Sequence, residues 1–193
     1  RRVLFRSLGR ELHAGRGGWA DPITPLAEAV ARASTWDATA NGPLILADLP
    51  DNPGGGSPGD ATYVLKAVLD AGLDGIAAGV YLDPLAVGYA IEAGVGARLR
   101  MRIGGKACPL SGPPLDLDVT VTAIDEHARI TLDGGIVVEM GRAVALRFDR
   151  GELVLAEQRN QTYGPSLFED LGVDLRSKRL ILVKSAQIGR ASC

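Results

Sequence analysis

Continuous apolar runs alternate with helical patterns over residues 44–103, and this order allows few folds. Three of the runs have the length and composition of buried strands, at 44–47, 75–82 and 97–103. One helix is predicted over 60–73 with Asp60 as its N-cap, and a second begins at Pro84, behind Asp83 as N-cap, and ends near Gly94. Strand, helix, strand, helix, strand is the order of a parallel sheet with crossover helices.

The pattern changes after Pro113-Pro114, where apolar and polar residues alternate with period two over 115–122. Such alternation is typical of a half-exposed antiparallel strand. The remaining predicted elements are strands at 128–132, 143–148, 153–157 and 180–183, and helices at 166–171 and 25–33, the last with Thr24 as N-cap. The predicted fold class is therefore α/β: a parallel sheet with crossover helices plus an antiparallel β insertion.

Both ends of the chain resemble translated adapter DNA from short-read sequencing. Arg1 to Ser7 are the translation of AGACGTGTGCTCTTCCGATCT, and Ile188 to Cys193 are that of ATCGGAAGAGCGTCGTGT. We therefore interpret residues 1–7 and 188–193 as adapter-derived and expect 8–187 to be a piece of a longer protein.

Without those ends, 17 basic residues face 23 acidic ones, a net charge of −6 in place of the −2 of the whole chain. An acidic chain with no basic stripe is a poor nucleic-acid binder, and no apolar run is long enough to cross a membrane. We therefore expect no nucleic acid and no membrane among the partners. Cys108 is then the sole cysteine and cannot form an internal disulfide, so a cytoplasmic location is the default expectation.

Polar residues that could bind a ligand follow the predicted buried strands. Open α/β sheets bind ligands outside the carboxyl ends of their strands. Asp48 and Asp51-Asn52 follow the first strand, Asp83 follows the second, and Lys184-Ser185 follow the last. We expect these side chains to meet at one edge of the sheet.

The densest of these segments is the glycine-rich run Asp51-Asn52-Pro53-Gly54-Gly55-Gly56-Ser57-Pro58-Gly59-Asp60. A glycine turn that leads into a helix presents backbone N–H groups suited to anions. A phosphate loop would carry a lysine where this run has the carboxylate of Asp60, so a nucleotide site is disfavoured. The structural alternative is a tight strand-to-helix connection in which the glycines only supply turn geometry.

A catalytic centre is not predicted within the chain itself. The two histidines, His13 and His127, are far apart and have no partner at zinc-ligand spacing, and we expect His127 to lie exposed in a turn. No serine or cysteine nucleophile stands in a recognisable elbow with a histidine base.

Several motifs together resemble the C-terminal domain of the MlrC (microcystinase C) metallopeptidase-like family. They occur in family order: Pro43 to Asp48 leading into Asp51 to Asp60, Tyr81-Leu82-Asp83-Pro84, Ala93 to Ala97, Ile103 to Lys106, Gly112-Pro113-Pro114, Leu171 to Asp174, and Val183-Lys184-Ser185. By this resemblance 8–42 is a helical segment connecting two domains, and 43–187 is the C-terminal α/β domain. In the family, the Lys-Ser pair is followed by a histidine and an aromatic residue. This chain departs from that pattern after Lys184-Ser185 and has Ile188-Gly189, where the adapter-derived end begins.

The resemblance implies a zinc-dependent hydrolase of peptide or amide bonds, in a family named for degrading linearised microcystin. Its zinc ligands lie in an N-terminal domain, so none transfers to this sequence and the fragment alone is expected to hold no cofactor and to be inactive. The implied partners are that N-terminal metal-binding domain of the same chain and a peptide or amide small-molecule substrate.

We expect two segments to contact the carbonyl or carboxylate of the substrate: the loop after the first strand, and Lys184 after the last strand. The predicted substrate-binding residues are Asp51, Asn52, Gly54, Gly55, Gly56, Asp60, Lys184 and Ser185. Two alternatives stay open. One is a non-catalytic structural or dimerisation domain that forms a homo-oligomer, and the other is an anion-binding α/β module.

Overall fold

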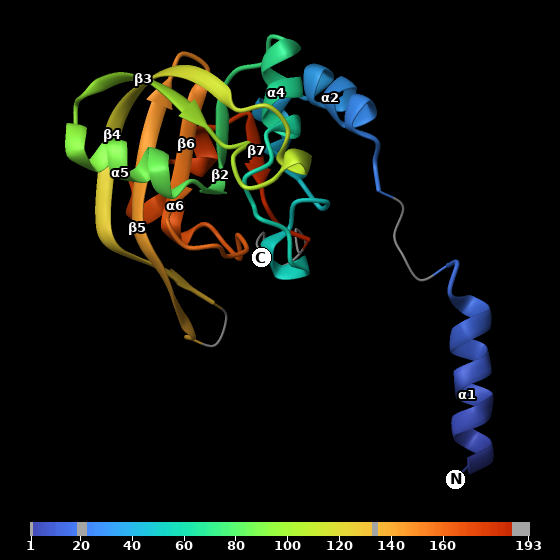
Figure 1. Cartoon of the computed structure of the whole chain (residues 1–193). Coiled ribbons are helices and arrows are strands. Elements are labelled where there is room, and N and C mark those ends of the chain that lie inside the picture. Colours follow the sequence, from blue (N-terminus) through green and yellow to red (C-terminus); the bar gives the residue numbers. More distant parts are fainter. Residues whose placement is uncertain (1, 19–22, 133–134, 187–193) are drawn as a thin grey trace.

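A computed structural model describes residues 2–18, 23–132 and 135–186 of the chain. The described residues form a single mixed sheet of seven strands in the order β1-β7-β2-β6-β5-β4-β3 (Figure 1). Residue 187 and the suspected adapter residues 188–193 lie outside the described residues.

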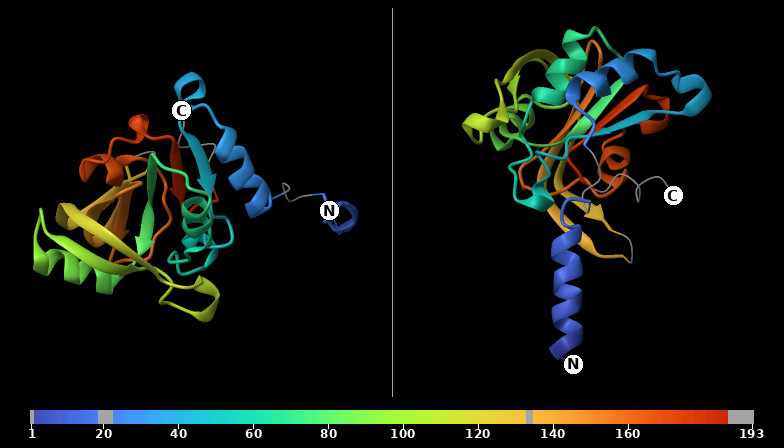
Figure 2. Two further views of the ribbon diagram at one scale, coloured as in Figure 1. Left: turned by 90° about the horizontal axis from the view of Figure 1, so that it is seen from above. Right: turned by 90° about the vertical axis from the view of Figure 1, so that its right-hand side faces the viewer.

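One half of the sheet is parallel and the other antiparallel. The parallel half consists of β1 (Leu44–Ala47), β7 (Leu180–Val183), β2 (Ile76–Leu82) and β6 (Gly151–Ala156). The antiparallel half consists of β5 (Val137–Phe148), β4 (Leu115–Thr131) and β3 (Arg98–Ile103), with β5 pairing to β6. The β4–β5 hairpin extends beyond the ends of its neighbours (Figures 1 and 2).

The helices are α1 (Arg2–Gly15), α2 (Leu26–Thr35), α3 (Ala38–Asn41), α4 (Tyr63–Asp70), α5 (Pro84–Ala93) and α6 (Ser166–Asp170). Short 3-10 helices are η1 (Pro53–Gly55), η2 (Pro109–Ser111) and η3 (Leu175–Ser177). Figure 1 shows α1 standing apart from the sheet. Among the described residues, no helix combines the length and apolarity needed to traverse a bilayer.

Alternation along the central strands places an apolar core on each face of the sheet. On β6, Leu153 and Leu155 join the larger core under α2, α4 and α5, whereas Val154 and Ala156 join the smaller core under α6. Both faces are covered, which explains why β6 and β7 are almost entirely buried and have no polar face.

The predicted fold class is confirmed: parallel strands, crossover helices and an antiparallel part are all present. The strand predicted at 97–103 exists as β3, but its expected place in the parallel sheet is wrong. It lies at the far edge, antiparallel to β4. The separate strands predicted at 115–122 and 128–132 are one long strand, β4, whose pairing with β5 shifts register at bulges near Ala123 and Ala128.

Two helix starts also differ from the prediction. Helix α2 begins after Pro25, which occupies the N-cap position expected for Thr24. Helix α4 begins after Thr62 rather than Asp60 and ends at Asp70. In contrast, Asp83 caps α5 as predicted and accepts the N–H of Ala86 at 3.1 Å.

Candidate functional site

The carboxyl ends of the parallel strands lie at one edge of the sheet. Asp48 follows β1, Lys184 follows β7, Asp83 follows β2 and Glu157 follows β6. At the same edge, the loop over 48–61 and the segment over 157–163 lie side by side (Figure 1). This is where the fold class places ligand sites.

Lys184 is the centre of a buried ion cluster at this edge and is 2% exposed. Its Nζ lies 2.7 Å from Asp48 Oδ2 and 3.0 Å from Asp51 Oδ2, and it also donates to the carbonyl of Ala61. The ammonium stands 4.6 Å from the centre of the buried Tyr81 ring, a cation–π distance. Of the three ammonium protons, two are donated to Asp48 and to the carbonyl of Ala61, and Asp51 lies at ion-pair distance.

The charge of Lys184 is fixed by its surroundings. Burial alone would lower the pKa of Lys184, but the electrostatic interactions with Tyr81, Asp48 and Asp51 and the hydrogen bond to Asp48 together raise it above its ordinary value. The pKa of Tyr81 is also raised, first by burial and against the opposing effect of Lys184. At neutral pH Lys184 is therefore an ammonium and Tyr81 a neutral phenol.

Asp51 closes the loop upon itself. Its Oδ1 accepts the N–H of Gly59 at 2.8 Å and its Oδ2 accepts that of Ala61 at 2.6 Å. Because the same carboxylate contacts Lys184, the two ends of the glycine-rich run are joined to the exit of β7. Asp51 is therefore a structural member of the loop, with its carboxylate directed inward.

Asp60 ties the loop to the segment after β3. Its oxygens accept the Ser111 hydroxyl at 2.5 Å and the N–H groups of Lys106 and Ala107, each at 2.7 Å. The predicted N-cap role of Asp60 is wrong, because its partners lie in the segment after β3 and not in the first turn of α4, whose N-cap is Thr62. Lys106 in turn reaches Asp83 at 2.5 Å, which ties the exit of β2 to the same segment.

Gly54 and Gly55 belong to η1 and Gly56 is its C-cap, and the N–H groups of all three have acceptors within the loop. Asn52 Oδ1 accepts from Gly54 at 3.0 Å, while Gly55 and Gly56 donate to the carbonyls of Asn52 and Pro53. Gly54 also lies so close to the buried Gln161 that a Cβ there would stand 2.0 Å from Gln161 Oε1. Gln161 donates to Ser185 Oγ at 3.0 Å.

The eight predicted site residues thus come together at one edge but divide into two groups. Asp51, Asp60, Lys184 and Ser185 are buried and bonded within the chain, whereas Asn52 is half-buried and the three glycines are exposed. The predicted substrate contact by Lys184 stays a prediction, and in this structure the ammonium is bonded to Asp48 and to the carbonyl of Ala61. Sequence reasoning missed Tyr81, Arg159 and Gln161, although the polar run Glu157-Gln158-Arg159-Asn160-Gln161 follows the end of β6 at Ala156.

The residues described do not fit a zinc ion. No group of three or more His, Cys, Asp and Glu side chains placed to hold a metal occurs in the described ranges. The carboxylates at the strand exits are already bonded to Lys184 or to N–H groups. His127 is exposed as predicted, but it lies within β4 rather than in a turn.

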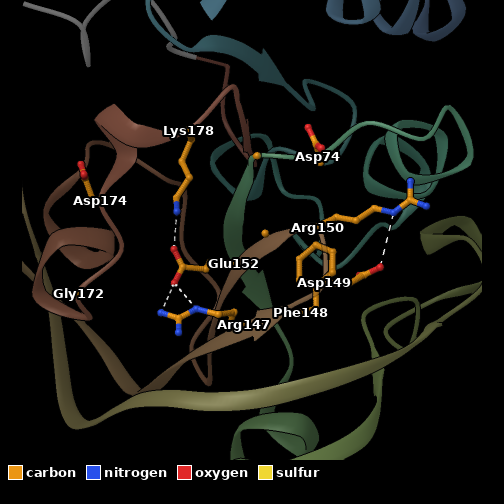
Figure 3. Close-up of a pocket in the computed structure, with 11 residues that line it drawn as sticks. Asp74, Arg147, Phe148, Asp149, Arg150, Glu152, Gly172, Asp174 and Lys178 are labelled. Carbon is orange, nitrogen blue, oxygen red and sulfur yellow. Dashed lines mark hydrogen bonds and ion pairs between the residues drawn. The ribbon is translucent and has the colours of Figure 1, made fainter. Parts of the chain in front are cut away.

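The opposite edge of the parallel strands carries a wide depression of about 710 Å³ (Figure 3). Buried Glu152 lies within it, 2.6 Å from Lys178 Nζ and 3.1 Å from Arg147 Nη2. Burial acts to raise the pKa of Glu152, but the hydrogen bonds and charges of Lys178 and Arg147 outweigh it and the pKa is lowered. The charged groups that could attract a ligand are thus occupied with one another.

Fold and site together define an α/β domain in which a buried ammonium fastens a glycine-rich loop at the carboxyl edge of a mixed sheet. Comparison with known proteins identifies the family. The model of the MlrC C-terminus family matches residues 46–193, so the chain belongs to that family.

Two relatives extend this assignment. Microcystinase C from Sphingomonas sp. is 40% identical over 145 residues, which are 75% of this chain and 28% of the relative. A crystal structure of a candidate metallopeptidase from Mesorhizobium sp. BNC1 superposes with a TM-score of 0.80 at 28% identity, covering 94% of this chain and 36% of that one. The chain therefore spans about a third of the length of either relative.

Proposed function

We propose that this chain is the C-terminal part of a zinc-dependent metallopeptidase that hydrolyses peptide or amide bonds, and that it forms one wall of the active-site cleft. In this proposal the metal and its ligands belong to an N-terminal domain of the same protein. Membership of the MlrC C-terminus family and the likeness to a candidate metallopeptidase support it.

The observation that carries the proposal is the loop held by Lys184. Folding two carboxylates and an ammonium into a buried cluster costs desolvation free energy, and the cluster's partners are backbone groups of the loop and the strands beside it. The result is a glycine-rich surface fixed at the strand exits, with the amide of Asn52 half-exposed on it. A fixed surface of this kind suits the positioning of a substrate.

Two measurements test the division of labour. The first is the zinc content of residues 8–187 purified without a His tag, which we expect to be folded and metal-free. The second is a chimera in which residues 44–186 replace the matching region of the Sphingomonas relative. The chimera should hydrolyse that relative's substrate in a chelator-sensitive way, whereas the relative without this region should be inactive. One zinc held tightly per isolated chain, or a truncated relative with full activity, would contradict the proposal.

Within the chimera, Asn52→Ala tests the loop itself. We expect turnover to fall or KM to rise by about tenfold, the scale of one lost polar contact of about 1.4 kcal/mol. Gln158→Ala, an exposed amide on the adjoining segment, is the matched control and should leave both constants unchanged. Unchanged kinetics in the Asn52 variant would remove the loop from the substrate site.

A further inference from the structure

Arg159 is an exposed residue of the segment after β6 that is held against the loop. Its Nη1 donates to the carbonyl of Pro53 at 2.8 Å and to that of Ser57 at 3.3 Å. These carbonyls lie at the start of η1 and just beyond its end. The side chain is therefore oriented by the loop rather than extended freely into solvent.

The two bonds use one side of the guanidinium only. A guanidinium has five N–H groups, and its Nε and Nη2 form the planar fork that binds a carboxylate with two parallel hydrogen bonds. Within the described residues, Nε and Nη2 of Arg159 make no hydrogen bond. The fork that matches a carboxylate is thus left for a ligand.

Arg159 is the exposed charge on this surface. Across residues 48–61 and 157–163, the carboxylates of Asp48, Asp51 and Asp60 are buried, Glu157 is half-buried and paired with Arg142, and Arg159 is the one exposed charged side chain. Asn52, which caps η1 through its Oδ1, has a side-chain N–H₂ with no acceptor among the described residues. Both side chains contact the same short helix, Asn52 through the N–H of Gly54 and Arg159 through the carbonyl of Pro53.

We propose that Arg159, assisted by the Asn52 amide, binds a carboxylate of the substrate and so selects peptides that carry one near the bond to be cleaved. This assignment rests on the proposed function for its substrate class. The carboxylate is either an acidic side chain or a free C-terminus, and both present the same planar pair of oxygens to the fork.

The test uses the full chain and three probes of nearly equal shape. N-acetyl-glutamate α-amide carries a side-chain carboxylate, N-acetyl-glutamine carries a terminal carboxylate, and N-acetyl-glutamine α-amide carries none. Titrations followed by the Nε–H resonance of Arg159 and by the backbone amides of Gly54–Gly56 give the affinities. We expect saturable binding of one or both acidic probes at millimolar concentration, and binding of the neutral probe that is weaker by about tenfold.

Variants separate recognition from support of the loop. Arg159→Gln should weaken binding of the acidic probe by about tenfold and leave that of the neutral probe unchanged, while Arg159→Lys keeps the charge, loses the fork and should recover only part of the affinity. Arg98→Gln is the matched control: Arg98 is an exposed arginine on β3, at the far edge of the sheet, and its loss should not affect binding.

The proposal is overturned if acidic and neutral probes bind equally, if no saturable binding occurs, or if Arg159→Gln and Arg98→Gln have the same effect. These outcomes are distinct from failure of the proposed function. An active chimera whose isolated domain shows no carboxylate preference rejects the role of Arg159 alone. An inactive chimera with intact carboxylate binding rejects the cleft assignment alone.

Discussion

The two edges of the parallel strands both contain buried carboxylates, but their counter-ions are placed differently. At the carboxyl edge, the ammonium of Lys184 is itself buried, and it forms ion pairs with both Asp48 and Asp51. At the opposite edge, buried Glu152 is neutralised from the surface by Arg147, which is largely exposed, and by Lys178.

This difference decides which edge can serve a ligand. At the depression of Figure 3, Arg147 and Lys178 point toward Glu152 and Arg150 is paired with Asp149, so a ligand would have to compete with a carboxylate already in place. At the carboxyl edge the buried charges bond to groups inside the domain, and the side-chain N–H₂ of Asn52 and the fork of exposed Arg159 are not used in those bonds. The presence of a depression is therefore a weaker indication of a ligand site here than whether the charged groups are already paired.

The largest expected effect is at Lys184. Lys184→Met would leave Asp48 and Asp51 buried without a cation, and we expect a loss of about 4 kcal/mol in the free energy of unfolding. Lys66→Met removes one partner of an exposed ion pair with Asp70 and should cost no more than about 0.5 kcal/mol. Denaturant unfolding of both variants measures the contrast, and equal losses would show that the buried cluster does not support the loop.

Glu152 should come next, with a dependence on pH. Glu152→Gln removes a buried charge that two cations share, for an expected loss of about 2 kcal/mol at neutral pH. Since the folded-state pKa of Glu152 is lowered, its contribution is fully present above the unfolded pKa of about 4.5 and is lost as the pH falls through the folded value. The wild type and Glu152→Gln should therefore converge in stability on the acid side.

Thermal unfolding between about pH 7 and pH 3 follows this convergence. Glu139→Gln, which removes one partner of the exposed pair with Arg129 on β4, is the control and should change stability little at any pH. A gap between wild type and Glu152→Gln that stays constant with pH would contradict the assigned role of the ion pairs.

The smallest effect distinguishes two neighbouring glycines. Gly54→Ala places a Cβ 2.0 Å from Gln161 Oε1, so Gln161 must move and lose its bond to Ser185, at a cost of about 1.5 kcal/mol. At Gly55 the nearest atom to a new Cβ is 3.7 Å away, so Gly55→Ala should be neutral or slightly stabilising. Unfolding midpoints compare the pair, and equal values would mean that Gln161 does not hold the loop as the contacts indicate.

Much of the architecture followed from local patterns. The buried strands and the start of α5 could be placed because apolar runs and an Asp-Pro cap act within a few residues. The meeting of Asp48 with Lys184 was also predictable, since carboxyl ends of parallel strands share an edge. Asp60 was misassigned because its partner Ser111 is 51 residues away in the sequence, and capping patterns describe only neighbours.

Arg159 was not predicted as a site residue because of the sheet topology. The strand before it was predicted in the antiparallel part, and β6 does pair antiparallel with β5. On its other side, however, β6 pairs parallel with β2, which places its exit at the same edge as those of β1 and β7. A strand shared by both halves of a sheet cannot be recognised from its own residues, because either pairing requires the same apolar run.

Local patterns were enough to predict the fold class, the strand exits and the glycine-rich loop, since periodicity and turn chemistry act over a few residues. Which polar side chains face inward depends instead on contacts between segments far apart in the chain. Asp51, Asp60 and Lys184 resemble ligand-binding residues in the sequence, yet a buried charge must find a partner at hydrogen-bond distance, and here each finds it inside the domain. The donors of Asn52 and Arg159 take no part in these buried contacts.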